Sequence, residues 1–222
     1  ACVTGVQTCA LPIFKSDGSL EDGFEIVSHP MTLEYHTEEM NWKEVLREAV
    51  SMGYRSHQTS TCGLHVHVNR NAFGDNQAEQ EDVISRILFF VEKHWNELFT
   101  FSRRSSYNMS RWSARFGFEK TGKQILEKAK SGCNGRYVAV NLNNYHTIEF
   151  RLFRGTLKYS TFIATLQMVN HICDAAISLS EEGIDAMSWS EFVSSIRKPE
   201  LIQYLKERRL YVNEMVAESE EM

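Results

Sequence analysis

The 222-residue sequence has few prolines and no long apolar run. Only three prolines are present, which argues against a disordered or linker-rich chain. No stretch approaches the roughly 18 consecutive apolar residues that a membrane-spanning helix needs, so we expect no membrane partner. Hydrophobic residues make up 42% of the chain, which is the composition of a globular protein with a substantial core.

The sequence also lacks an excess of positive charge. Its net charge of -5 gives it no general attraction for nucleic acid or an anionic membrane surface, so we expect neither as a partner. The five cysteines show no disulfide-framework spacing, and outside the first residues an odd number remains: Cys62, Cys133 and Cys173. We interpret them as reduced thiols of a cytoplasmic protein.

The first residues read as a non-native leader. Residues 3–13, VTGVQTCALPI, resemble the in-frame translation of a sequencing adapter. We therefore expect a leader at 1–13, a single domain at 14–212 and a frayed acidic tail at 213–222.

Hydrophobic periodicity and turn residues predict the elements of the domain. Strands are expected at residues 23–28, 63–69, 136–142 and 147–153, with a hairpin turn at 143–146. Helices are expected around 42–50, 83–99, 122–130 and 160–177, with a capping box at Ser188 and Glu191 and a further helix from Pro199. Residues 102–116 are expected to form a loop. This order predicts an α+β fold with a mainly antiparallel sheet.

Two histidines share one face of the strand at 63–69. Side chains alternate along a strand, so Leu64 and its apolar neighbours point into the core while His65 and His67 point the other way. Paired imidazoles backed by aliphatic residues suit a metal or a phosphate. The alternative is a solvated strand face that happens to carry histidines.

The strand at 147–153 places a carboxylate and a guanidinium together in the same way. Glu149 and Arg151 share the face opposite Ile148 and Phe150. A carboxylate is a hard ligand suited to Mg²⁺, and arginine binds phosphoryl or carboxylate groups bidentately. An ion pair on an exposed sheet surface is the alternative. Glu25, on the strand at 23–28, could join the same polar face.

Taken together, the three strands predict one polar sheet face that holds metal and phosphate. The ordered segments that carry the pattern are DGSL and GFEIVSHP (17–30), CGLHVHVN (62–69), RYVAVNLNN (136–144) and TIEFRLFRGTL (147–157). This set resembles the amidoligase family, a relative of glutamine synthetase and glutamate–cysteine ligase. The resemblance implies a curved, mainly antiparallel sheet with helices packed on one face, as in the glutamine synthetase catalytic domain.

The resemblance also implies a role for each matching residue. The metal ligands would be Glu25, His65 and Glu149. The ATP contacts would be His67, Arg136 and Asn141. The catalytic arginines would be Arg151 and Arg154. The family's opening strand, which supplies further metal ligands, would precede the DGSL turn, where this chain has the adapter-like residues.

The implied reaction is the ATP-dependent joining of a small-molecule or peptide carboxylate to an amine through an acyl phosphate. Its cofactor would be Mg²⁺, or Mn²⁺ in its place. Two alternatives stay open. One is a metal-dependent hydrolase that uses His65, His67 and Glu149. The other is a non-catalytic module of the same fold.

Overall fold

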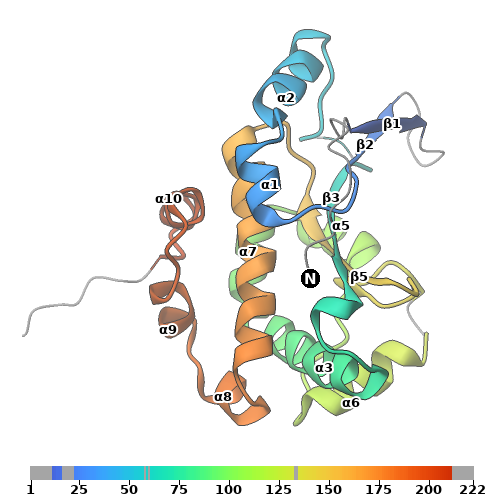
Figure 1. Ribbon diagram of the computed structural model, residues 1–222, viewed down its shortest axis with the longest axis vertical. Coiled ribbons are helices and arrows are strands. Elements are labelled where there is room, and N and C mark those ends of the chain that lie inside the picture. The colour runs from blue at the N-terminus through green and yellow to red at the C-terminus, as the bar shows by residue number, and fades with distance from the viewer. Residues whose placement is uncertain (1–11, 17–22, 58, 60, 133–134, 212–222) are drawn as a thin grey trace, which may run out of the picture.

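The computed structural model describes residues 12–16, 23–57, 59, 61–132 and 135–211 (Figure 1). Most of the expected leader and the whole expected tail at 213–222 lie outside these ranges, as does the DGSL turn. Within them the fold is α+β, with two small antiparallel sheets and several helices. In this part of the chain no helix is both long enough and apolar enough to cross a membrane.

The larger sheet has three strands in the order β3-β5-β4. These are β3 (Gly63–Asn69), β5 (Thr147–Arg154) and β4 (Val140–Asn141), and both pairings are antiparallel. The predicted hairpin between β4 and β5 is confirmed. β4 is much shorter than the expected strand at 136–142. Before β4, the Ala139 carbonyl still accepts from the Arg151 amide of β5 at 2.8 Å. Its own amide instead donates to the carbonyl of Ala114, and Ala114 donates to that of Tyr137.

The second sheet corrects our expectation of one continuous sheet. β2 (Phe24–Val27) pairs antiparallel with β1 (Ile13–Ser16), a strand that the sequence pattern does not predict. β5, the central strand of the larger sheet, has both edges filled, by β3 and β4. The strand at 23–28 is therefore formed, but in a separate hairpin. In that hairpin Glu25 lies opposite Lys15.

Helices account for most of the remaining elements. In chain order they are α1 (Leu33–Glu38), α2 (Trp42–Ser51), the 3₁₀ helix η1 (Arg70–Ala72), α3 (Gln77–Lys93), α4 (Trp95–Ser102), α5 (Ser106–Trp112), α6 (Gly122–Lys130), α7 (Tyr159–Ser178), α8 (Glu181–Ala186), α9 (Trp189–Ser194) and α10 (Pro199–Glu207). The capping box of Ser188 and Glu191 is confirmed at α9, and Pro199 opens α10 as predicted.

Three helix predictions need correction. The long helix expected over 83–99 is broken at His94, whose ψ of 33° ends α3 and begins α4. The loop expected at 102–116 contains α5, which Ser105 caps by accepting a hydrogen bond from the Asn108 amide. α7 begins at Tyr159 with Lys158 at its N-cap, so Ser160 lies inside the helix. The polar sequence of α5 does not predict a helix, because the stability of such a short helix comes from its cap and from packing.

The main core lies between the larger sheet and the helices. α7 is the central helix, with the larger sheet to one side of it and α9 and α10 to the other (Figure 1). Ile148 and Phe150 of β5 are fully buried in the same cluster as Ile84 of α3 and Met168 of α7. Burying such side chains contributes about 1.5–3 kcal/mol each, which fixes the core face of the sheet. The opposite face is left to polar residues.

Candidate active site

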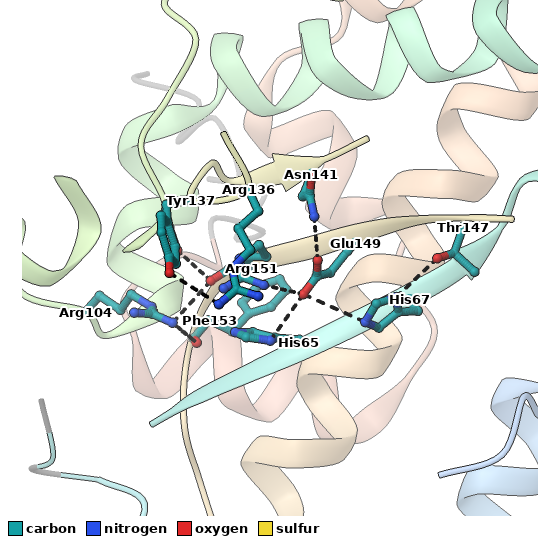
Figure 2. Close-up of polar contacts among 11 residues, drawn as sticks. His65, His67, Arg104, Arg136, Tyr137, Asn141, Thr147, Glu149, Arg151 and Phe153 are labelled. Carbon is teal, nitrogen blue, oxygen red and sulfur yellow. Dashed lines mark hydrogen bonds and ion pairs between the residues drawn. The ribbon is translucent and has the colours of Figure 1, made fainter. Parts of the chain in front are cut away.

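β3 carries its two histidines on the face predicted from the sequence. Leu64, Val66 and Val68 pack against the main core. His65 and His67 alternate with them and lie together with residues of β4 and β5 (Figure 2). The pleat of a strand, with side chains pointing alternately to its two faces, accounts for this separation.

Glu149 of β5 is the centre of the polar cluster. It is only 5% exposed, and in the sheet it lies opposite His67 on one side and Asn141 on the other. Its Oε2 accepts a hydrogen bond of 2.8 Å from Asn141 Nδ2, and its Oε1 accepts one of 2.5 Å from Arg151 Nη1. Three strands therefore contribute to one buried carboxylate (Figure 2).

Both histidines approach the same carboxylate oxygen. His65 Nδ1 lies 3.2 Å and His67 Nε2 lies 3.8 Å from Glu149 Oε1. The Nδ1 of His67 is also 3.2 Å from the hydroxyl of Thr147. In the His65 tautomer that donates from Nδ1, the Nε2 lone pair is left for another partner.

A register shift shapes the strand pair beside this cluster. Leu64 pairs with Phe153, but Val66 pairs with Phe150, so β5 has one extra residue opposite His65. Strict alternation would place Phe153 on the face of Glu149 and Arg151. The extra residue returns Phe153 to the core, where it is 2% exposed. The sequence pattern gave no sign of this shift.

Arg151 is held between Glu149 and an aromatic ring. Its side chain is 11% exposed, and its guanidinium carbon lies 5.8 Å from the centroid of the Tyr137 ring. Arg136 lies over the same ring at 5.2 Å. The Nε of Arg151 is buried without a hydrogen-bond partner, so the arginine retains an unused donor.

The surroundings of Glu149 favour its charged form. Burial acts to raise the pKa of this carboxyl, but the hydrogen bond from Asn141 and the positive charge of Arg151 outweigh it, and the pKa is lowered. Glu149 is therefore an anion at neutral pH. Its partner Asn141 is itself oriented by the amide of Asn143, which donates to Asn141 Oδ1 at 3.0 Å.

His65 is neutral in the same conditions. Burial, followed by the positive charge of Arg151, lowers its pKa to about 4, and the nearby Glu149 offsets only part of that effect. A neutral imidazole can ligate a metal or accept a proton through its free nitrogen. The cluster thus combines one anion, one buried cation and an uncharged base.

Two predicted site residues lie apart from this cluster. Glu25 is exposed on β2 in the separate hairpin, which the structure does not bring into the sheet of Glu149. Arg154, the last residue of β5, lines a small cavity with Thr161 and Tyr204. Across the described ranges no three His, Cys, Asp or Glu side chains are arranged to hold a metal ion. The expected ligand set of Glu25, His65 and Glu149 is thus not assembled.

Arg104 is the main site residue that sequence reasoning did not select. Its segment, 102–116, has several arginines and reads equally well as a solvated loop. In the structure its Nη2 donates to the carbonyls of Arg151 and Phe153 at 3.2 and 3.1 Å, and Figure 2 shows it beside the cluster. The only signal in the sequence is the polar run Ser-Arg-Arg-Ser at 102–105, which directly follows an apolar helix.

Residues 13–173 match the model of a family described as "Putative amidoligase enzyme". The chain belongs to the amidoligase family. The matched region runs from β1 into α7, so it contains His65, Asn141, Glu149 and Arg151 of this amidoligase. Membership in this family places the protein among the ligases as a broad class of enzyme. α8, α9 and α10 lie beyond the match.

The comparisons with curated proteins and with solved structures gave no match for this amidoligase. The likeness to the glutamine synthetase catalytic domain therefore stays a prediction.

Proposed function

We propose that this amidoligase uses ATP to join a carboxylate to an amine at the Glu149 cluster. The observation that supports the proposal best is the convergence of Asn141, His65 and Arg151 on one buried carboxylate from three strands. Family membership supports ligase chemistry in general. The Glu149 cluster is a set of polar side chains on one sheet face, and it lies within the region that matches the family.

The proposed reaction has two steps. A carboxylate oxygen of the substrate attacks the terminal phosphorus of ATP, which forms an acyl phosphate and releases ADP. An amine then attacks the acyl carbon, inorganic phosphate leaves, and the amine nitrogen loses a proton. The first step moves a charged phosphoryl group, so positioning and electrostatic stabilisation dominate its catalysis.

The residues of the cluster suit these needs. Arg151 is a buried guanidinium with an unused Nε donor, which fits a group that stabilises phosphoryl oxygens. In this proposal neutral His65, beside Glu149, accepts the proton that the amine loses through its remaining ring nitrogen. Asn141 holds the Glu149 carboxylate in place by its hydrogen bond.

The donor set fits Mg²⁺ brought in with the nucleotide better than a metal held by protein ligands alone. Mg²⁺ commonly binds through one or two carboxylates together with substrate phosphates and waters. Glu149, with His67 beside it, would hold the ion, which when bound neutralises phosphate charge. A zinc hydrolase needs three protein ligands, and the described residues do not assemble that set.

Nucleotide binding tests the proposal. Binding of Mg²⁺–ATP would be measured by calorimetry for the wild-type chain and for Glu149→Gln, whose folded state is checked first by circular dichroism. We expect the substitution to weaken binding by at least about 10-fold, because a carboxylate ligand is lost.

Glu25→Gln is the matched control, since it removes the same charge from the exposed strand β2. It should leave the affinity unchanged. Equal affinity of wild type and Glu149→Gln, or no nucleotide binding by either, would remove the basis of the assignment.

A further inference from the structure

Arg104 enters the candidate site through a sharp change of chain direction. α4 ends at Ser102, and Arg103 adopts a left-handed conformation with φ of 61°. From there the Arg104 guanidinium reaches β5. Its Nε and Nη2 donate to the Phe153 carbonyl at 3.3 and 3.1 Å, and Nη2 also donates to the Arg151 carbonyl at 3.2 Å. Arg104 is therefore attached to the backbone that carries Arg151.

These carbonyls belong to the part of β5 where the register shifts opposite His65. Ser113 supports the same region, because its hydroxyl donates to the Arg151 carbonyl at 2.6 Å. Arg104 and Ser113 thus supply hydrogen-bond donors where the regular ladder to β3 is interrupted.

Gly63 explains how the guanidinium comes so close to β3. A Cβ at this position would lie 2.7 Å from Arg104 Nη2 and 2.8 Å from His65 Nε2. Both distances are far below ordinary contact distances to a Cβ. The absent side chain of Gly63 therefore leaves the space in which Arg104 and the His65 ring meet.

The charges around this space are unbalanced. Arg104 and Arg151 are both cations, and Glu149 is the carboxylate that pairs with Arg151. Burial and the charge of Arg151 lower the pKa of Arg104 to about 10, so it remains protonated at neutral pH. Two guanidinium groups in a partly buried place repel each other unless an anion joins them.

Hydrogen-bond donors are also left over. The Nε of Arg151 is buried and unpartnered. Among the described residues, Arg104 forms its hydrogen bonds through Nε and Nη2, and none involves its Nη1. Arginine nitrogens in a buried site are satisfied best by the oxygens of a phosphate or carboxylate.

We propose that Arg104 and Arg151 form a paired-guanidinium subsite beside Gly63 that binds one oxyanion of the substrates. The shared chemistry is a phosphoryl or carboxylate group with two or more exposed oxygens. This inference rests on the proposed function, since it assigns that site a second arginine. Arg104 contacts the ligand directly in this arrangement and also holds the backbone of Arg151.

The test measures the affinity of the full chain for inorganic phosphate and, in a separate arm, for glutarate, both without nucleotide. We expect Arg104→Gln to weaken binding of the preferred anion about 10-fold, because a charge-assisted hydrogen bond is lost. Arg104→Lys keeps the charge but loses the planar fork, so it should weaken binding about 3-fold. The arm with the stronger binding identifies the phosphoryl or the carboxylate group as the natural occupant.

Arg103→Gln is the control, since it removes the same charge from the adjacent exposed residue and should leave both affinities unchanged. A second readout is the shift in melting temperature that each anion causes, taken relative to each variant's own anion-free value. If Arg104 is only structural, Arg104→Gln lowers the melting temperature but leaves this shift intact. That result would overturn the inference, as would a wild-type chain that binds neither anion.

The two proposals can fail separately. Anion binding that depends on Arg104, in a protein that does not bind Mg²⁺–ATP, would retain the subsite and remove the ligase mechanism. If Mg²⁺–ATP binding depends on Glu149 but anion affinity does not change in Arg104→Gln, the ligase mechanism is retained and the subsite is rejected.

Discussion

Glu92 and Glu149 are both buried glutamates that pair with an arginine, yet the groups around them differ. Glu92, on α3, accepts a hydrogen bond of 2.8 Å from Arg115 Nε and one of 2.7 Å from the Phe116 amide. Both partners belong to one short segment. Glu149 is instead approached by four side chains from three strands, and two of these side chains are histidines.

The difference concerns which polar groups are left unsatisfied. Each Glu92 oxygen has a hydrogen-bond partner, and the Arg115 side chain is 39% exposed, so water can solvate it. Beside Glu149, Arg151 is nearly buried and its Nε has no partner. Unsatisfied buried donors cost stability and are tolerated mainly where a ligand satisfies them. The Glu92 pair therefore closes a loop onto α3, whereas the unsatisfied donor beside Glu149 supports the site proposed above.

Replacing Glu149 should produce the larger loss of stability. Glu149→Gln leaves the buried Arg151 without its counter-ion and close to Arg104, so the free energy of unfolding should fall by about 3 kcal/mol. Inorganic phosphate at ten times its dissociation constant should restore about 1.4 kcal/mol, because it binds the folded state. Urea unfolding with and without phosphate measures both effects. Wild-type stability in the variant would show that Arg151 needs no counter-ion.

Replacing Glu92 should have a smaller effect that phosphate does not specifically offset. In Glu92→Gln the amide oxygen can still accept from Phe116, and Arg115 can turn to water, so we expect a loss of about 2 kcal/mol. The same urea titrations provide the measurement. The stabilisation by phosphate should equal that of the wild type. A larger rescue by phosphate here than in Glu149→Gln would reverse the distinction between the two glutamates.

The sequence could predict the faces of strands and the local hairpin of β4 and β5, but not how strands far apart in the chain join. Alternation placed His65 and His67 opposite Leu64 and Val66, and Glu149 opposite Ile148, because side-chain direction is a local property of a strand. The same reasoning placed Glu25 on a polar face, and it does lie on a strand. Pairing is non-local, however, and β2 joins β1 in a hairpin of its own. The metal ligand expected there is therefore missing from the cluster.

Two further features of the site depend on tertiary structure alone. The extra residue of β5 opposite His65 changes no local pattern, since Leu152 and Phe153 are apolar in either register. Arg104 is one of several arginines in a polar segment, and only the left-handed turn at Arg103 directs it to the sheet. The role of Glu92 was equally hidden, because its partners follow more than twenty residues later.

Histidines also distinguish the two glutamates, because no histidine in the described part of the chain forms an ion pair with Glu92. The pKa of His65 is near 6.5 in the unfolded chain and about 4 in the folded protein. The unfolded state therefore binds more protons between these values, so the stability from neutral His65 is present above pH 6.5 and is lost as pH falls toward 4. Partial exposure of the ring limits the loss to about 1–2 kcal/mol.

Comparing His65→Gln with the wild type isolates this contribution from other buried histidines, such as His94 and His171, whose pKa values are also lowered by burial. Free energies of unfolding at pH 7 and pH 4.5 provide the measurement. The wild type should lose about 1–2 kcal/mol more than the variant between the two values. An identical acid response of His65→Gln and wild type would mean that His65 is not held neutral beside Arg151. The Glu149 cluster would then still differ from the Glu92 pair in the unsatisfied Nε of Arg151, but not through a histidine held neutral.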